Sequence, residues 1–301
     1  MTLSIQDHFA DPILDNLPSR EIDIDNRSNS SELTDYQVTV DVSNYVDKQG
    51  VRFVDENLQI VNYWEEDSNT IWAEIPNITG SKVSAVRLMH GDVDSMSDGD
   101  VTFDFFDDFT IDGLNTDKWE LRNSPTEIDA QLECINDEFV VSKTSFDVRG
   151  KAVRWKTKII SGEDRQHWLL GDVKTTETSS PYGASGQDGY SLNRYDNIGR
   201  VRPIVNGSMG VDWSDNYYFS GFSPSNWHTI EMSIEYNSPY LTKFRIKKSI
   251  WDSVYEENWQ HSDYDMYIYI GVKGTSESVT SRHDWIFVHK YTSPEPTAVI
   301  A

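Results

Sequence analysis

Cysteine and basic residues are scarce in this sequence. One cysteine, Cys134, occurs among 301 residues, and 26 Lys and Arg stand against 50 Asp and Glu, which gives a formal net charge of −24. A single thiol cannot form an internal disulfide, so a disulfide-stapled fold is excluded. Nucleic acid and anionic membrane surfaces are excluded as default partners, because proteins that bind them neutralise phosphates with Lys and Arg. Cys134 is flanked by Leu132 and Ile135, so we expect a buried small hydrophobe.

Long apolar runs and catalytic motifs are also missing. No run approaches the roughly 20 residues that span a bilayer, and residues 1–16 lack the basic start and apolar centre of a signal peptide. We therefore expect a soluble chain with no membrane insertion and no export signal of its own. No nucleophile elbow, phosphate loop or dinucleotide fingerprint occurs. The seven histidines show no zinc spacing; they are His8, His90, His167, His228, His261, His283 and His289.

Acidic residues are abundant and evenly dispersed. Asp supplies 32 of the 50 acids, and only 13 Lys are present. A dispersed carboxylate surface stays hydrated at high salt, where charge repulsion is screened within a few ångströms. We interpret the composition as that of a protein from a halophilic host, with an ordinary acidic surface as the alternative.

Alternation of apolar and polar residues recurs along the chain, while helical periodicity is nearly absent. Residues 227–236 alternate in this way and predict a half-buried strand. Similar strands are predicted at residues 37–42, 70–76, 151–159, 243–248, 265–272 and 284–291. Short strands separated by clusters of Asn, Asp, Gly, Ser and Pro are typical of antiparallel sandwiches. We predict an all-β fold of two consecutive antiparallel β-sandwich domains.

Composition shifts indicate the domain boundaries. Residues 1–30 are polar and predict an extended N-terminal arm, residues 31–102 a small β-sandwich, and residues 103–301 a second domain. Residues 91–103 contain four Asp and no basic residue, and we interpret them as a hydrated connector. Residues 174–189 are too poor in apolar side chains to pack, so they predict a long surface loop, where binding residues often lie.

The order of words in residues 31–91 is DYQV, RFVDEN, YW and IWAEIP. It resembles an uncharacterised β-sandwich family of archaeal and bacterial surface proteins. In that family a second domain follows, which opens with FFDDF and resembles a concanavalin A-like lectin/glucanase jelly roll. Residues 105–109, Trp119 and the closing words DWIFVHKYTSPEP at residues 284–296 fit this pattern. The resemblance implies that the second domain has this fold.

Enzymes with the lectin/glucanase fold carry carboxylates on one strand face. Glu127, Asp129 and Glu133 lie at i, i+2 and i+6, which places them on one face of an extended strand. Retaining hydrolysis needs two carboxyl groups about 5 to 5.5 Å apart. The third acid lies too far along for the motif, so we interpret the three as a solvated acidic face and expect no catalytic residue.

The same resemblance implies a structural Ca²⁺ where the first and last strands of the jelly roll meet, since such a hard cation takes oxygen ligands. Asp107, Asp108 and Asp284 lie in those two words. The alternative is that Asp107 and Asp108 cap a turn and that Asp284 pairs with Arg282 or with water.

Ten Trp and 15 Tyr are many for this length. Most are expected in the core, because jelly rolls fill their interior with aromatic rings. Exposed rings beside polar groups would stack on sugars. The candidate glycan-binding residues are Trp168, Tyr182, Tyr190, Arg194, Trp213, Asp215 and Tyr217. Four sequons, at Asn26, Asn29, Asn77 and Asn206, matter only if the chain meets a glycosylation machinery.

Three cations reverse the acidic character locally. Arg154, Lys156 and Lys158 alternate with apolar residues and so share one strand face. They are candidates for an interface with an acidic glycan or a partner subunit. The alternative is pairing with Glu or Asp on a neighbouring strand.

Taken together, these features favour a non-catalytic recognition protein that binds host surface glycans. Relatives of this architecture are usually exported, yet residues 1–16 show no signal peptide, and a virion component would reach the outside without one. We therefore expect a homo-oligomeric virion component, such as a haloarchaeal tail fibre, turret or capsid decoration, whose residues 1–30 could dock onto an assembly. The expected location is the virion surface or the extracellular space. The alternatives are an exported adhesin, a glycoside hydrolase or lyase of the lectin/glucanase fold, and a purely structural assembly protein.

Overall fold

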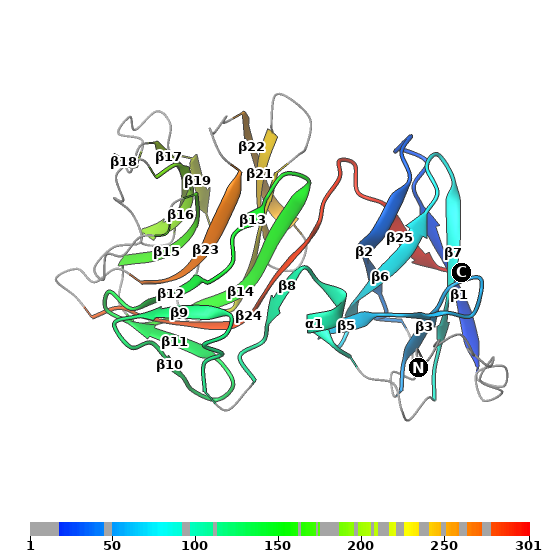
Figure 1. Ribbon diagram of the computed structural model, residues 1–301, viewed down its shortest axis with the longest axis horizontal. Coiled ribbons are helices and arrows are strands. Elements are labelled where there is room, and N and C mark those ends of the chain that lie inside the picture. Colours follow the sequence, from blue (N-terminus) through cyan, green and yellow to red (C-terminus); the bar gives the residue numbers. More distant parts are fainter. Residues whose placement is uncertain are drawn as a thin grey trace, which may run out of the picture. The chain divides into compact units, whose positions relative to one another are not determined.

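The computed structural model describes residues 18–44, 50–91, 97–110, 113–161, 164–172, 174, 187–195, 198–205, 208–209, 217–220, 226–234, 241–247, 251–258, 264–272 and 278–301. The chain forms two compact units, the first from Met1–Phe105 with Ser293–Ala301 and the second from Phe106–Thr292. Both consist of antiparallel sheets (Figure 1). Over the described ranges the one helix is α1 (Gly99–Thr102), and no helix there could cross a membrane. The predicted all-β fold class is confirmed.

The first unit contains two sheets. The five-stranded sheet has the order β25-β1-β7-β3-β4, and the three-stranded sheet has the order β2-β6-β5. Their bounds are β1 Ser19–Asp25, β2 Leu33–Asp41, β3 Arg52–Val54, β4 Ile60–Val61, β5 Tyr63–Asp67, β6 Thr70–Ile78, β7 Val83–Met89 and β25 Thr297–Ile300.

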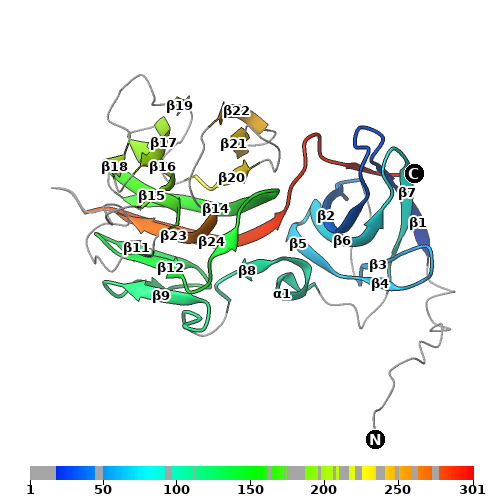
Figure 2. The same ribbon diagram turned by 45° about the horizontal axis from the view of Figure 1, so that its top comes forward.

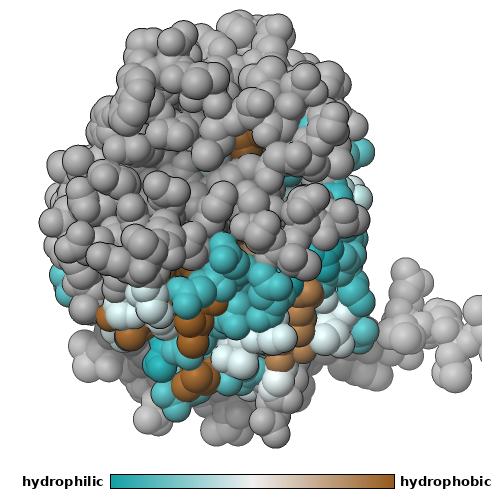
Figure 3. Space-filling view, turned by 90° about the vertical axis from the view of Figure 1, so that its left-hand side faces the viewer, coloured by the Kyte–Doolittle hydropathy of each residue, from teal (hydrophilic) through white to brown (hydrophobic). Residues whose placement is uncertain are grey.

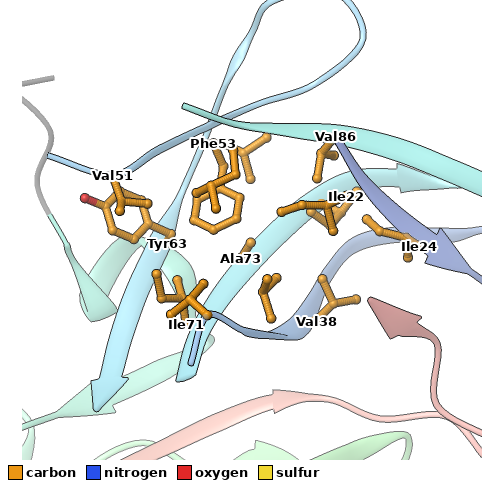
Figure 4. Packing of buried hydrophobic residues seen from close by; sticks show 14 of the residues in the cluster. Ile22, Ile24, Val38, Val51, Phe53, Tyr63, Ile71, Ala73 and Val86 are labelled. Carbon is orange, nitrogen blue, oxygen red and sulfur yellow. The ribbon is translucent and has the colours of Figure 1, made fainter. Parts of the chain in front are cut away.

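One apolar core lies between these two sheets. Because successive side chains of a strand point to opposite faces, Ile22 and Ile24 of β1 point inward while Asp23 is exposed. Figure 4 shows them facing Val38 and Ala73 of the other sheet, all within one buried cluster.

The termini of this unit differ from the prediction. Residues 19–25 are not part of an extended arm: they form β1, which pairs with β7 from Ser19↔Met89 to Asp25↔Val83. The physical reason is the alternation in EIDID, whose two isoleucines are fully buried. Residues 293–301 were predicted to belong to the second domain, but they are part of the first unit, because β25 pairs with β1. Part of the predicted connector is ordered as α1, with Asp98 as its N-cap.

The second unit consists of two large sheets. The eight-stranded sheet has the order β10-β11-β24-β14-β20-β21-β22, with β8 also paired to β24, and the nine-stranded sheet has the order β18-β17-β16-β15-β23-β12-β9, with β13 on β23 and β19 on β17. The bounds are β8 Phe105–Asp107, β9 Trp119–Arg122, β10 Thr126–Glu127, β11 Leu132–Ile135, β12 Phe139–Ser142, β13 Phe146–Asp147, β14 Lys151–Ser161, β15 Asp164–Gly171, β16 Gly189–Tyr195, β17 Ile198–Val205, β18 Ser208–Met209, β19 Tyr217–Ser220, β20 His228–Ile234, β21 Leu241–Lys247, β22 Trp251–Asn258, β23 Asp265–Val272 and β24 Thr280–Lys290.

The two sheets of this unit pack face to face (Figure 2). A cavity of about 10 Å³ lies between them, lined on one side by Val153, Trp155, Met232 and Ile286 and on the other by Leu170, Ile268 and Ile270. This space holds one water molecule at most. A sugar therefore has no room between the sheets at this place.

The predicted strands are present, with β20 packed more deeply than expected. Alternation predicted a half-buried strand, but six of the seven residues of β20 are buried, so both of its faces are covered. Cys134 is fully buried, as predicted, and burial raises the pKa of its thiol well above the usual value. Among the side chains described in this unit, few large apolar ones are exposed, for example Leu121 and Ile160. Figure 3 shows small hydrophobic areas among hydrophilic ones on one side of the molecule.

Candidate functional site

The outer face of the eight-stranded sheet carries the main cluster of polar side chains. It is the face opposite the cavity, and we define it by the side chains of β14, β20 and β24 that point away from the nine-stranded sheet. The strand register sets Lys156 beside Thr229 and Trp285, and Arg154 beside Glu231 and Phe287. The next register row brings together Ala152, Ser233 and His289.

A buried ion-paired cluster occupies the middle of this face. Arg154 Nη1 lies 3.2 Å from Glu231 Oε2, and His289 Nε2 lies 3.6 Å from the same oxygen. Arg154 is only 3% exposed and Glu231 2%. The nearby Ser233 Oγ is also buried and has no hydrogen-bond partner within the described part of the chain. Buried polar groups nearly always have partners, so Ser233 is an exception within this cluster, and its full burial keeps it from solvent.

Aromatic rings border the ion-paired cluster along β24. Trp285 stacks on Phe287 with ring centroids 5.3 Å apart, and Phe287 contacts the ring of His289 at 5.7 Å. Because these residues are two apart on one strand, their side chains share one face. The packed rings hold His289 in place beside Glu231.

The neighbouring part of the same face is partly open to solvent. The half-buried indole of Trp227 precedes β20, and the Nζ atoms of Lys156 and Lys158 lie 5.4 Å and 4.5 Å from its centroid. Lys156 also binds Asp284 at 2.7 Å, and the side chains of this pair are 28% exposed. An aromatic ring beside charged donors and acceptors is an arrangement that can bind a sugar.

A second aromatic–cation pair lies on the other sheet. Lys174 Nζ is 4.9 Å from the centroid of Tyr267, and it also binds Glu120. The hydrogen bonds from Lys174 and Arg122 lower the pKa of the Glu120 carboxyl. This pair also joins an aromatic ring, a lysine and a carboxylate, so it offers a matched comparison for experiments.

Most of the predicted glycan-binding residues cannot be assigned a side-chain environment. Tyr182, Trp213 and Asp215 lie outside the described residues. Trp168, Arg194 and Tyr217 belong to β15, β16 and β19, where the backbone alone is described. Tyr190 was predicted wrongly, because its side chain is fully buried and offers no ring to a ligand.

The three predicted interface cations have different surroundings. Arg154 is not available at a surface, because it is buried against Glu231 as the alternative had foreseen. Lys156 and Lys158 remain partly exposed beside Trp227. The interface prediction is therefore corrected for Arg154 and stays open for the two lysines.

The predicted acidic strand face does not exist. Glu127 ends β10 and Glu133 lies in β11, while Asp129 lies in the turn between them with φ of +55°. Glu127 accepts a hydrogen bond from Gly113 N, and Glu133 binds Arg282 at 2.9 Å. Because a hairpin interrupts the strand, alternation does not align these three acids.

The three carboxylates predicted to bind Ca²⁺ each have a protein partner. Asp107 accepts hydrogen bonds from Phe109 N and from Trp119 Nε1, and its burial raises the pKa of its carboxyl. Asp108 caps Thr110, and Asp284 binds Lys156. Across the described ranges, no group of three metal-binding side chains lies together. The turn caps at Asp107 and Asp108 agree with the alternative interpretation, and the Ca²⁺ site stays a prediction.

His283 makes the stability of the second unit depend on pH. Its fully buried ring lies 3.1 Å from Ser281 Oγ, and burial lowers its pKa from 6.5 to about 3. Below pH 6.5 the unfolded chain takes up a proton that the folded chain does not, so the unfolding free energy falls as pH falls. From pH 6.5 to 5 we expect a loss of about 2 kcal/mol. Unfolding curves of wild type and His283→Gln measure this, since the difference between them should shrink by that amount on acidification; a constant difference would contradict it.

Glu231 was overlooked in the sequence. The signal was the row of Trp227, Thr229, Glu231 and Ser233, which alternate with residues that face the cavity. Alternation predicts which residues of this strand face the core, but it does not predict what the polar residues between them bind. The buried pairing with Arg154, 77 positions away, could not be predicted from local pattern.

Comparison with known proteins gives a fold and no named function. A family model described as a domain of unknown function (DUF2341) matches residues 47–122. No curated protein matches the chain. One solved structure with 13% identity is the Emp47p carbohydrate recognition domain, with a TM-score of 0.48 over 62% of this chain and 94% of that one. The laminarinase from Flavobacterium sp. UMI-01 also has 13% identity, with a TM-score of 0.46 over 62% of this chain and 100% of that one. A third comes from work on endo-acting O-glycanases of human gut microbiota and has 13% identity and a TM-score of 0.48, covering 63% of this chain and 100% of that one. At this similarity, only the jelly-roll architecture of the second unit is in common.

Proposed function

We propose that the second unit is a non-catalytic carbohydrate-binding module that uses the outer face of its eight-stranded sheet. The observation that carries this proposal is the half-buried Trp227 ring beside Lys156, Lys158 and Asp284. The C–H faces of sugars stack on aromatic rings, and their hydroxyls bond to charged side chains. Amphipathic indoles are well suited to such partly wet contacts.

The ion pairs on this face support binding over catalysis. Glycoside hydrolysis requires one carboxylic acid and a second carboxylate flanking the bond. Glu231 is ion-paired with Arg154, and Asp284 is ion-paired with Lys156. Carboxylates held in this way are suitable acceptors for sugar hydroxyls.

We place this binding at the surface of an assembly, in concentrated salt. The net charge of −24, mostly from dispersed Asp, supports a saline setting because such a surface stays hydrated there. A virion component that contacts host glycans is the setting we favour, and an exported adhesin is the alternative. Binding to cells of a saline host, compared between purified protein and assembled particles, tests this setting.

A glycan array in high salt tests the site. We expect Trp227→Ala to weaken binding about tenfold or more, which corresponds to about 1.4 kcal/mol, because the stacking surface is removed. The matched control is Tyr267→Ala, which removes an aromatic–cation pair from the other sheet and should leave affinity unchanged.

Three outcomes would contradict the proposal. Loss of binding in Tyr267→Ala alone would move the site to the nine-stranded sheet. Release of shorter oligosaccharides would make the protein an enzyme. Absence of binding by the wild type to any glycan or host cell would favour a purely structural role.

A further inference from the structure

The first unit is completed by a strand from the far end of the chain. Residues 293–301 belong to it, although residues 106–292 form the other unit. Within this segment β25 pairs with β1 from Ile22↔Ile300 to Asp25↔Thr297, and Ala301 N donates to Glu21 O at 2.9 Å. β25 stands at the end of the five-stranded sheet. The edge of β1 is therefore a site that accepts an extended segment.

The attachment of β25 is small. It has four residues, of which Ala298 and Ile300 are half-buried against the core of the unit. Val299 points outward and is 61% exposed. Few side chains of β25 thus hold it. The rest of the attachment of residues 293–301 includes backbone pairing, the hydrogen bond from Asn29 Nδ2 to Pro294 O at 2.9 Å and the buried Pro296, and a second copy of the chain can supply the same contacts.

The sequence of β25 matches the accepting edge. β1 presents Glu21, Asp23 and Asp25, whereas β25 reads Thr-Ala-Val-Ile and carries no charge. An acidic segment would be repelled at this edge, since like charges on paired strands destabilise a sheet. Ile300 is opposite the fully buried Ile22. The edge therefore selects a neutral strand with apolar residues at alternate positions.

A short connection joins β25 to the second unit. β24 ends at Lys290 and β25 begins at Thr297, so six residues lie between them, two of which are Pro294 and Pro296. Proline fixes φ and stiffens the chain. A short, stiff connection is the type of hinge that favours exchange of a terminal element between copies.

We infer that the β1 edge accepts β25 from a second copy of this chain, so that copies assemble by exchanging their C-terminal strands. The exchanged strand makes the same contacts as in the single chain. The balance between the two forms is then set by protein concentration and by the hinge, because no contact is gained or lost at the edge. This inference does not depend on glycan binding by the second unit.

Disulfide trapping in the full chain tests the exchange. Asp23 and Val299 are paired and both exposed, so cysteines there lie within disulfide distance. We expect a mixture of Asp23→Cys and Val299→Cys chains to form a covalent heterodimer under mild oxidation, in a yield that rises with concentration. Native Cys134 is fully buried and adds little background. Excess peptide of residues 292–301 should reduce the yield.

Two controls decide the result. The double variant Asp23→Cys/Val299→Cys should close within one chain when dilute, which checks the register. Thr297 pairs with Asp25 and not with Asp23. A mixture of Thr297→Cys and Asp23→Cys chains therefore gives the background yield of heterodimer from cysteines that are out of register. A heterodimer yield equal to that background, or a double variant that fails to close, overturns the inference.

Discussion

Glu231→Ala is expected to lower the unfolding free energy of the second unit by about 3–5 kcal/mol. The variant leaves Arg154 buried, at 3% exposure, without its carboxylate at 3.2 Å. A buried charge without a partner keeps its full desolvation cost, and that cost exceeds the value of an ordinary hydrogen bond. Chemical denaturation measures the loss, and hydrogen exchange at β14 and β20 assigns it to this unit.

Two further variants separate burial from pairing. Replacing both partners, as Arg154→Met/Glu231→Leu, should recover most of the stability because no charge remains buried. Asp284→Ala breaks the pair with Lys156, which is 28% exposed, and should cost no more than about 1 kcal/mol. A double variant as unstable as Glu231→Ala alone would show that the loss comes from packing and not from the charge.

Local alternation was sufficient to predict several of the strands. Residues 265–272 were predicted as a strand and form β23 with the same bounds, because Met266, Ile268 and Ile270 fill the core from one face. The all-β fold class followed from the repetition of such segments, whereas the domain boundaries were predicted from shifts in composition. Alternation failed for Asp129, where a turn with positive φ interrupts the strand.

Long-range pairing was beyond such prediction. The return of β25 to β1 joins residues nearly 280 positions apart, and no local pattern encodes it. The candidate site has the same origin, since register alone brings Arg154 beside Glu231 and Lys156 beside Trp285. The sequence showed that the cations of β14 share one strand face. Which of them are buried depends on the neighbouring strands, which the sequence did not reveal.

Several cations of this acidic chain form ion pairs on the sheets of the second unit. Arg154, Lys156 and Arg282 bind carboxylates across strands of one sheet, and Lys174 binds Glu120 on the other. Cross-strand pairs of opposite charge stabilise a sheet. The carboxylates of these pairs are neutralised, although the chain as a whole carries a net charge of −24. A ligand at Trp227 would therefore meet paired charges, which suits a glycan with many hydroxyls.

Gly271→Ala is expected to cost the second unit about 3 kcal/mol, at the upper end of overpacking effects. A Cβ atom at this position would lie 2.3 Å from Phe139 Cβ and 2.4 Å from Glu138 O. Neither atom can move without displacing β12, because Gly271 pairs with Phe139 and Val272 N donates to Glu138 O at 3.0 Å. The strands must separate to admit one methyl group.

Gly171→Ala is the matched control, since its Cβ would meet the Nε2 atom of Gln187 at 2.7 Å, at the end of a side chain. Moving the end of one buried side chain requires less displacement than separating two strands, so we expect a clearly smaller loss than for Gly271→Ala. Thermal unfolding and hydrogen exchange at β12 and β23 compare the two variants. Equal losses would mean that the sheet yields at Gly271 as readily as a side chain does at Gly171, and would refute the close packing of β12 against β23.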